Sequence, residues 1–264
     1  MPELPDLEAA RRLLTWRLTG QVITAVEVPD ADVFRNVPAE LAARMIERRR
    51  VGPVDRQGKW LQVHTDGPTA MVHLGMTGTL RWTYAPKGEL TRDRVRLRTS
   101  DGAIALADPR RLSGVWLLEP GHESDEVTGR LGPDASSITD DGLAGILSAH
   151  RGSVKATMMN QAWLAGLGNT LSDEILWRAG VHPGTRADRL GVVEVQAIRR
   201  SMKSALDHSV RVGRIPRTAR WLASQRASKT PQCPRCGASL ERSRFGSRTS
   251  VWCPRCQPVD GPSE

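Results

Sequence analysis

Pro2 and Glu3 are the first residues of this chain whose types could carry out chemistry. A cell commonly removes Met1 before a small second residue, which would leave Pro2 as a free secondary amine. An α-amino group titrates at about 7.7–8.0, so part of it is unprotonated and nucleophilic near neutral pH. Such an amine can attack a sugar carbon and form a Schiff base, with Glu3 in reach to move protons. By itself the stretch fits an ordinary helix start better, because Pro5 followed by acidic residues is common there.

The four cysteines form two Cys-x-x-Cys pairs near the end of the chain. Cys233 and Cys236 are followed, after sixteen residues, by Cys253 and Cys256. Each pair offers two thiolates to one ion, and the spacing suits a hairpin that closes a tetrahedral site for one structural Zn²⁺. Unmetallated thiols are the alternative. Four thiolates would leave no position on the metal for a substrate.

A glycine-rich turn, Gly166-Leu167-Gly168-Asn169, is a candidate phosphate site. Two glycines allow backbone N–H groups to approach a phosphate, a helix that begins at Thr170 adds its dipole, and Asn169 adds a side-chain donor. A plain helix–helix turn explains the pattern equally simply.

Isolated polar residues in the first half of the chain form a third group of candidates, and we expect all of them in turns. They are Lys59, His73 and the Arg110-Arg111 pair. Each becomes a candidate for phosphate binding only if other features already indicate a surface that binds nucleic acid.

Composition indicates a polyanionic partner. The 264 residues include 38 Lys and Arg against 29 Asp and Glu, a formal charge of +9. This favours nucleic acid or an anionic membrane surface. No apolar run approaches the roughly 20 residues of a membrane-spanning helix, and the acidic start is unlike a signal peptide, so we expect a soluble intracellular protein.

The elements that must position these residues change in character along the chain. Residues 22–28, 60–63, 71–74, 94–98, 104–106 and 115–118 alternate or form short apolar runs, which predicts an antiparallel sandwich with helices at 5–18 and 38–48. Residues 119–137 have the composition of a linker. Helices are predicted at 142–150, 154–159, 170–180 and 192–210, with Thr170 and Asp173 as a capping box. The basic residues between 199 and 229 fit a solvated face as well as a phosphate-binding surface.

The chain resembles, from end to end, the bacterial formamidopyrimidine-DNA glycosylase and endonuclease VIII family. The motifs that carry the resemblance are PELPDLE, QGKWL, HLGMTG, DPRRL, LGPD, AGLGNTLSDEILWRAGVHP and the four cysteines, in the family's order. The resemblance implies a multi-domain α+β fold: an N-terminal antiparallel β-sandwich with flanking helices, then a helix–two-turn–helix domain with a zinc finger. The corresponding ranges are 1–119, a linker at 120–138, 139–228 and 229–258, with a tail at 259–264.

The same resemblance implies a bifunctional enzyme of base excision repair that removes damaged, oxidised bases and cleaves the strand at the abasic site. Damaged DNA would be the partner of a monomeric protein in the bacterial cytoplasm. Pro2 resembles the family's nucleophile and Glu3 its acid/base residue. The residues that fall at DNA-phosphate positions are Lys59, which we also place in the catalytic set, His73, Asn169 and Arg248. Those that resemble residues filling the void left by an everted nucleotide are Met76, Arg110 and Leu112, with Lys155 at a further position near the lesion.

Three departures from the family pattern bear on the lesion. Leu112 stands where 8-oxoguanine enzymes typically have Phe, and Arg92-Asp93-Arg94 replaces a His-Asp-His segment, so that Arg92 stays a DNA-binding candidate. The segment 212–232 is shorter than in enzymes for oxidised purines and lacks the loop that caps 8-oxoguanine. A non-catalytic lesion-binding paralogue and a glycosylase for bulky adducts or crosslinks therefore remain as alternatives.

Overall fold

The computed structural model describes residues 1–84, 92–122, 124–245 and 248–259. They divide into two compact units, which we describe separately. The first comprises Met1–Pro2 and Asp6–Arg130, and the second comprises Glu3–Pro5 and Leu131–Glu264.

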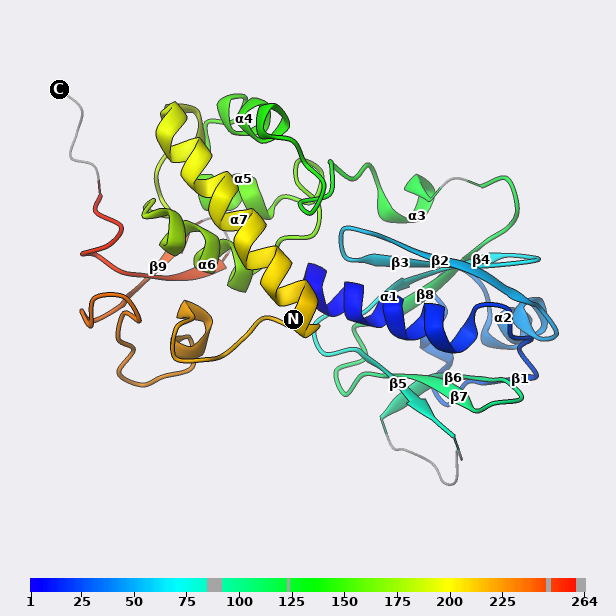
Figure 1. Ribbon diagram of the computed structural model, residues 1–264. Helices are drawn as coiled ribbons and strands as arrows, with labels where there is room; N and C mark the ends of the chain where they lie inside the picture. Colours follow the sequence, from blue (N-terminus) through cyan, green and yellow to red (C-terminus); the bar gives the residue numbers. More distant parts are fainter. Residues whose placement is uncertain (85–91, 123, 246–247, 260–264) are drawn as a thin grey trace. The chain divides into compact units, whose positions relative to one another are not determined.

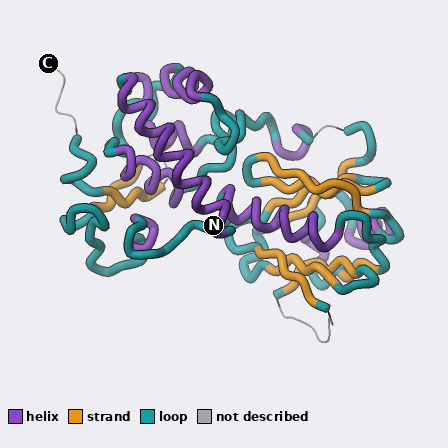
Figure 2. The backbone as a smooth tube through the Cα atoms, viewed as in Figure 1, coloured by secondary structure: helices purple, strands orange, loops and turns teal. Residues whose placement is uncertain are grey.

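The first unit is built around two four-stranded antiparallel sheets (Figures 1 and 2). One sheet has the order β2-β3-β4-β8, formed by Val51–Gln57, Trp60–Thr65, Thr69–His73 and Gly114–Leu118. The other has the order β1-β6-β7-β5, formed by Ala25–Glu27, Asp93–Arg98, Ala103–Ala107 and Thr79–Thr83. This unit also contains helix α1 (Leu4–Leu18) from Asp6 onward, helix α2 (Ala39–Ile46) and a short 3₁₀ turn, η1 (Ala31–Val33). The predicted sandwich is confirmed.

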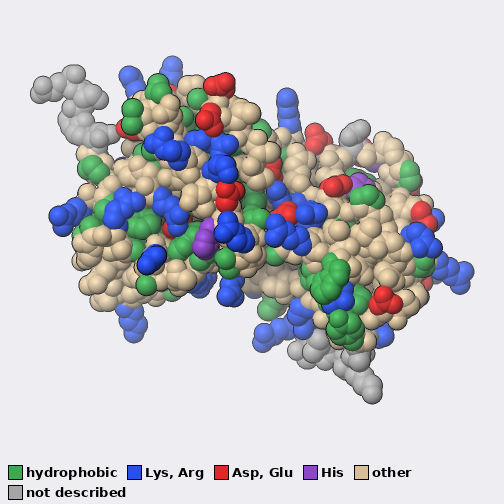
Figure 3. All heavy atoms as spheres, in the orientation of Figure 1, with side chains coloured by type: hydrophobic (Ala, Val, Ile, Leu, Met, Phe, Trp, Pro, Cys, Tyr) green, Lys and Arg blue, Asp and Glu red, His purple; other side chains and the backbone are tan. Residues whose placement is uncertain are grey.

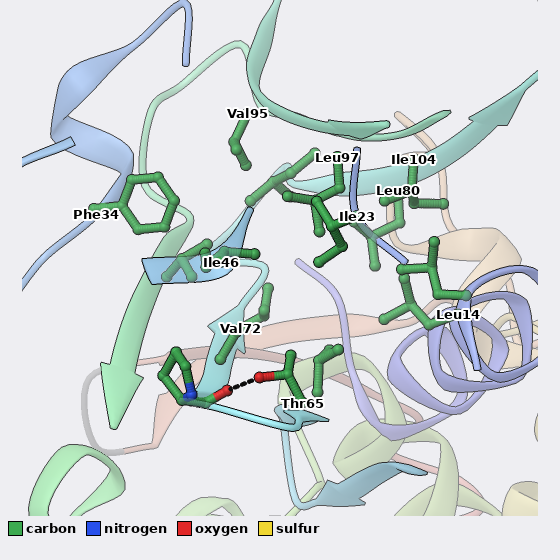
Figure 4. Close-up of a pocket in the computed structure, with 16 residues that line it drawn as sticks. Leu14, Ile23, Phe34, Ile46, Thr65, Val72, Leu80, Val95, Leu97 and Ile104 are labelled. Atoms are coloured by element: carbon green, nitrogen blue, oxygen red, sulfur yellow. Dashed lines mark hydrogen bonds between the residues drawn. The ribbon is translucent and has the colours of Figure 1, made fainter. Parts of the chain in front are cut away.

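The core of this unit lies between the sheets, because successive side chains of a strand point to opposite faces and each sheet turns an apolar face to the other. Leu61 and Val63 of one sheet pack in a single cluster with Ile104 and Leu106 of the other, and Leu14 of α1 joins them. A cavity of about 60 Å³ remains among these side chains (Figure 4). Thr65 lines it, but its hydroxyl already donates to the Pro68 carbonyl at 2.7 Å, so we assign the space to core packing.

The second unit is helical and ends in a hairpin. Its helices are α4 (Asp140–Ser148), α5 (Val154–Met159), α6 (Asn169–Ala179) and α7 (Val192–Val212), with 3₁₀ turns η2 (Ala187–Arg189) and η3 (Leu222–Gln225). Strands β9 (Glu241–Phe245) and β10 (Arg248–Trp252) pair antiparallel. Ile175 of α6 and Ile198 of α7 lie in one buried cluster, so the helix-period pattern of both segments serves packing.

The segment predicted as a linker contains a short helix, α3 (Asp125–Thr128), and the two units divide within that segment, after Arg130. Two expectations about strands need correction. Of residues 22–28 only Ala25–Glu27 form a strand, β1, at a sheet edge. Strand β2 was not predicted from the sequence, because an irregularity in the strand pairing between Val51 and Val54 interrupts the alternation of its side chains.

No helix within the described ranges has the length and apolar character needed to cross a membrane.

Candidate functional site

The carboxylate of Glu3 lies at the N-terminus of α6. It is almost fully buried, and its two oxygens accept backbone hydrogen bonds from Gly168 (2.8 Å), Thr170 (2.8 Å) and Leu171 (3.1 Å). These N–H groups have no partner inside the helix, and the helix dipole favours a negative charge there. Glu3 is thus fixed by three donors and caps α6.

Two glycines make this approach possible. A Cβ at Gly168 would lie 2.4 Å from Cδ of Glu3, and one at Gly166 would lie 2.7 Å from Cδ1 of Leu4. Gly166 also has a φ of +106° and accepts the Leu4 N–H at 3.1 Å. The amide of Gly168 binds Glu3, and the amide of Gly166 donates to Oε1 of Gln161 at 3.0 Å. The interpretation that these two glycine amides bind a phosphate is therefore wrong.

The predicted capping box is also wrong. Gly168 is the N-cap residue of α6 and has no side chain to cap with, and the helix begins at Asn169 rather than Thr170. Asp173 points elsewhere: its carboxylate accepts from Val251 N at 3.0 Å and pairs with Lys155, whose Nζ lies 2.6 Å from Oδ1.

Lys155 is fully buried on α5. Its ammonium also donates to Oγ of Ser250 at 2.6 Å. Burial, followed by the nearby charge of Arg226, lowers the pKa of Lys155 to about 7. The side chain of Lys155 has no exposed surface in this structure. A direct contact between Lys155 and DNA stays a prediction.

Asn169 and Arg248, the two residues of this unit that are predicted to bind phosphates, lie close in the structure. Nδ2 of Asn169 donates to the carbonyl of Thr249 at 3.1 Å. Thr249 follows Arg248, which is exposed at the start of β10. The helix N-terminus and the hairpin are therefore joined at the residues that were expected to bind DNA.

In the first unit, Lys59 and His73 lie at one end of the sheet. Lys59 is in the tight turn between β2 and β3, while His73 ends β4, opposite Trp60, rather than lying in a turn as expected. Nδ1 of His73 accepts the Gly75 N–H at 3.1 Å, so the neutral ring carries its proton on Nε2. Burial and then the charge of Lys59 lower the pKa of His73, which leaves a neutral ring that can donate to a phosphate.

The segment 108–113 presents Arg110 and Leu112 to solvent. Asp108 organises it: its oxygens accept N–H groups from Arg110 (3.1 Å), Leu112 (2.8 Å) and Ser113 (2.7 Å), and the hydroxyl of Thr77. Leu112 is 45% exposed although it is a large apolar residue. The backbone of residues 108–113 therefore keeps the apolar side chain of Leu112 exposed to solvent.

The half-exposed Met76 lies beside this loop. Gly75, with φ +60°, packs so closely that a Cβ there would lie 2.6 Å from the carbonyl of Leu112. The three predicted void-filling residues thus belong to one surface of the first unit.

Sequence reasoning missed the residues that support this loop. Arg94 is buried, with Nε donating to Oδ2 of Asp30 at 2.8 Å and Nη1 to the carbonyl of Ser113. Arg92 remains exposed, and its carbonyl accepts the Asp108 N–H at 2.9 Å. The Asp-Pro pair at 108–109 is a turn signal that could have identified Asp108. A buried arginine inside a strand gives no such signal.

The four cysteines converge at the base of the β9–β10 hairpin. All four sulfur atoms lie within 4.8 Å of one another, with Cys233 to Cys256 at 3.8 Å and Cys236 to Cys253 at 3.6 Å. Zinc–thiolate bonds of about 2.3 Å in a tetrahedron require sulfur separations of about 3.8 Å. Nε1 of Trp177 donates to Sγ of Cys233 at 3.3 Å, an outer contact typical of metal-bound thiolates. The residues fit one structural Zn²⁺.

Family models match nearly the whole chain. The formamidopyrimidine-DNA glycosylase N-terminal domain matches residues 1–115, the H2TH domain of the same family matches 131–220, and the zinc finger found in FPG and IleRS matches 232–259. Among curated proteins, the formamidopyrimidine-DNA glycosylase of Geobacter metallireducens is 34% identical over 269 residues, covering 97% of this chain and 100% of that protein. That of Thermomicrobium roseum is 34% identical over 294 residues, covering 98% and 100%.

Solved structures agree. A complex of the Lactococcus lactis enzyme with DNA containing an abasic site has a TM-score of 0.85 at 25% identity, covering 98% of this chain and 100% of that one. A complex of the same enzyme with N7-benzyl-Fapy-dG DNA gives 0.85 at 25%, with the same coverage. This chain therefore belongs to the formamidopyrimidine-DNA glycosylase family.

Proposed function

We propose that the protein is a DNA glycosylase with AP lyase activity that acts in base excision repair. The observation that carries this proposal is the carboxylate of Glu3, held by three backbone donors directly after Pro2 in the chain. Fixed donors orient a catalytic group before the substrate arrives, which is how enzymes gain rate from electrostatics. Membership of the family supports the reaction type.

In the proposed reaction, the Pro2 amine attacks C1′ of the deoxyribose and the damaged base leaves with a proton. The sugar ring opens as the C1′–O4′ bond breaks, and an iminium forms between C1′ and the proline nitrogen. Loss of a C2′ proton expels the 3′ phosphate, and a second elimination expels the 5′ phosphate. Glu3 assists ring opening and the proton transfers.

Before this chemistry the nucleotide must leave the base stack, which costs a few kcal/mol and leaves a hole in the duplex. Leu112, with Met76 and Arg110 beside it, is proposed to fill that hole, as apolar wedges do in other DNA-bending proteins. The phosphates are proposed to bind to Lys59, His73, Arg92, Asn169 and Arg248, with their charge-assisted hydrogen bonds setting the register.

The zinc ion is proposed to stabilise the hairpin that carries Arg248. Four thiolates fill a tetrahedral site, so no step of the reaction passes through the metal.

Trapping with borohydride tests the covalent mechanism. Borohydride reduces the iminium to a stable amine, so wild-type protein should become crosslinked to DNA that contains an abasic site. Pro2→Gly should form far less adduct, and a non-catalytic lesion-binding protein should form none. Absence of wild-type adduct, in protein shown by intact mass to lack Met1, would refute the proposal, whereas retention of Met1 would block the amine.

A second candidate substrate is a bulky adduct or crosslink. In the structure the short segment after α7 is tied to the second unit: Trp221 is buried, Glu174 accepts the Ala223 N–H at 3.2 Å, and Arg226 pairs with Asp173. A segment anchored in this way is poorly suited to fold over a base. A panel of oligonucleotides with oxidised, ring-opened and bulky lesions separates the two substrates by the product each yields.

We further propose that the protein is a monomer of the bacterial cytoplasm, since its net charge of +9 favours repulsion between copies. Light scattering tests the oligomeric state. The division at residues 119, 138, 228 and 258 is likewise a proposal, and limited proteolysis tests it.

A further inference from the structure

A cluster of four buried or half-buried charges lies around the N-terminal half of α6, within the second unit. The carboxylates are Glu3 and Asp173, and the cations are Lys155 and Arg226. Glu3 interacts electrostatically with both cations. When Lys155 is protonated, the two charges of each sign balance, which is the condition for keeping ionised groups out of water.

Asp173 is the centre of this cluster. Oδ1 lies 2.6 Å from Nζ of Lys155, while Oδ2 pairs with Arg226 and accepts the Val251 N–H at 3.0 Å. An acidic residue near a helix start often serves only the helix dipole. Asp173 instead directs its oxygens away from its own helix, to a different strand and two other segments.

The contacts of this cluster converge on β10. Lys155 donates to Oγ of Ser250 at 2.6 Å and to the carbonyl of Thr249 at 3.3 Å, and Asp173 binds Val251. Three consecutive residues of the strand are thus held by one charge cluster. Asn169, four residues before Asp173 on α6 and therefore on the same side of the helix, donates to the same Thr249 carbonyl.

We propose that Asp173 is a positioning residue of the DNA-binding site. Held between Lys155 and Arg226, it fixes β10 on α6 and so sets the spacing between Asn169 and Arg248, which then act on the phosphates as one clamp. This rests on the proposed function, because the spacing matters only if both residues bind DNA. The zinc ion holds the base of the hairpin, and the charge cluster holds the start of β10.

The test uses full-length protein with zinc content measured for every variant. Asp173→Asn keeps the shape and leaves both cations with one carboxylate. The double variant Asp173→Asn/Lys155→Met restores the charge balance while removing the tie to β10. Arg248→Ala is made in the wild-type, single-variant and double-variant backgrounds, and the affinity for duplex DNA with a tetrahydrofuran abasic analogue is titrated against salt.

We expect Asp173→Asn to lower the unfolding temperature and to weaken DNA binding about tenfold or more, as loss of one charged contact does. The double variant should recover the unfolding temperature but not the affinity. In both backgrounds Arg248→Ala should cost little further affinity, and the slope of log K against log salt should already be lower by about 1.

Two results would overturn the proposal. One is a double variant that recovers affinity together with stability, and the other is an Arg248→Ala loss of equal size in all backgrounds, which would mean independent sites. Wild-type protein that does not bind the DNA would instead refute the proposed function, and this inference with it.

Discussion

Replacing Gly168 by Ala adds one methyl group beside the carboxylate of Glu3, the proposed acid/base residue. The new Cβ would lie 2.4 Å from Cδ and 2.8 Å from Oε1 of Glu3, and contacts this short force a displacement. Because Glu3 is buried and bound at both oxygens, moving it breaks hydrogen bonds from α6. Hydrogen bonds to a charged group contribute about 1.5–3 kcal/mol each, so loss of two removes about 3–6 kcal/mol from the bound orientation.

Both the rate and the fold should suffer. A misplacement of about 1 Å can cost about 10²-fold in rate. At about 2–4 °C per kcal/mol, the lost hydrogen bonds should lower the unfolding temperature by roughly 6–24 °C. We therefore expect single-turnover cleavage of abasic DNA, and borohydride trapping, to slow by about 100-fold at a temperature where the variant is still folded.

The matched control is Gly145→Ala on α4. A Cβ at Gly145 meets nothing within 4 Å, and Ala there should leave the rate unchanged while favouring the helix. The reasoning is refuted if Gly168→Ala cleaves abasic DNA within about twofold of the wild-type rate.

Three further predictions concern other parts of the site. Burial lowers the pKa of His73 in the folded protein, so the unfolded chain takes up a proton first as the pH falls below about 7. The free energy of unfolding of the wild type should therefore fall more steeply with decreasing pH than that of His73→Gln. Parallel curves of unfolding free energy against pH would contradict this. Asp108→Asn should loosen the loop around Leu112 and slow base excision more than abasic-site cleavage, since only the former must evert an intact base; equal losses would count against a wedge. Chelation should remove one zinc per chain and weaken DNA binding, and undiminished affinity of the metal-free protein would show that the hairpin does not contribute.

Local signals in the sequence predicted the elements that depend on near neighbours. Helix α5 was predicted at 154–159 and observed at Val154–Met159, with Ser153 as its cap, and the two Cys-x-x-Cys pairs predicted the zinc site from spacing alone. The cap of α6 could not be predicted in this way. It comes from Glu3, 165 residues before Gly168, and a local pattern cannot report a partner so distant in the chain. The burial of Arg94 could not be predicted for the same reason, since its partners Asp30 and Ser113 lie on other segments of the chain.

The charge cluster also bears on how Glu3 is held. Backbone N–H groups bind it, although Lys155 and Arg226 are near enough to interact with it. Asp173 pairs with both of these cations. Removing Asp173 should therefore affect two sites at once: β10 loses its anchor, and both cations are left to Glu3. This predicts that Asp173→Asn changes the pH dependence of single-turnover cleavage as well as DNA affinity, while Arg248→Ala, which alters no charge in the cluster, weakens binding and leaves the pH profile of bound substrate in place.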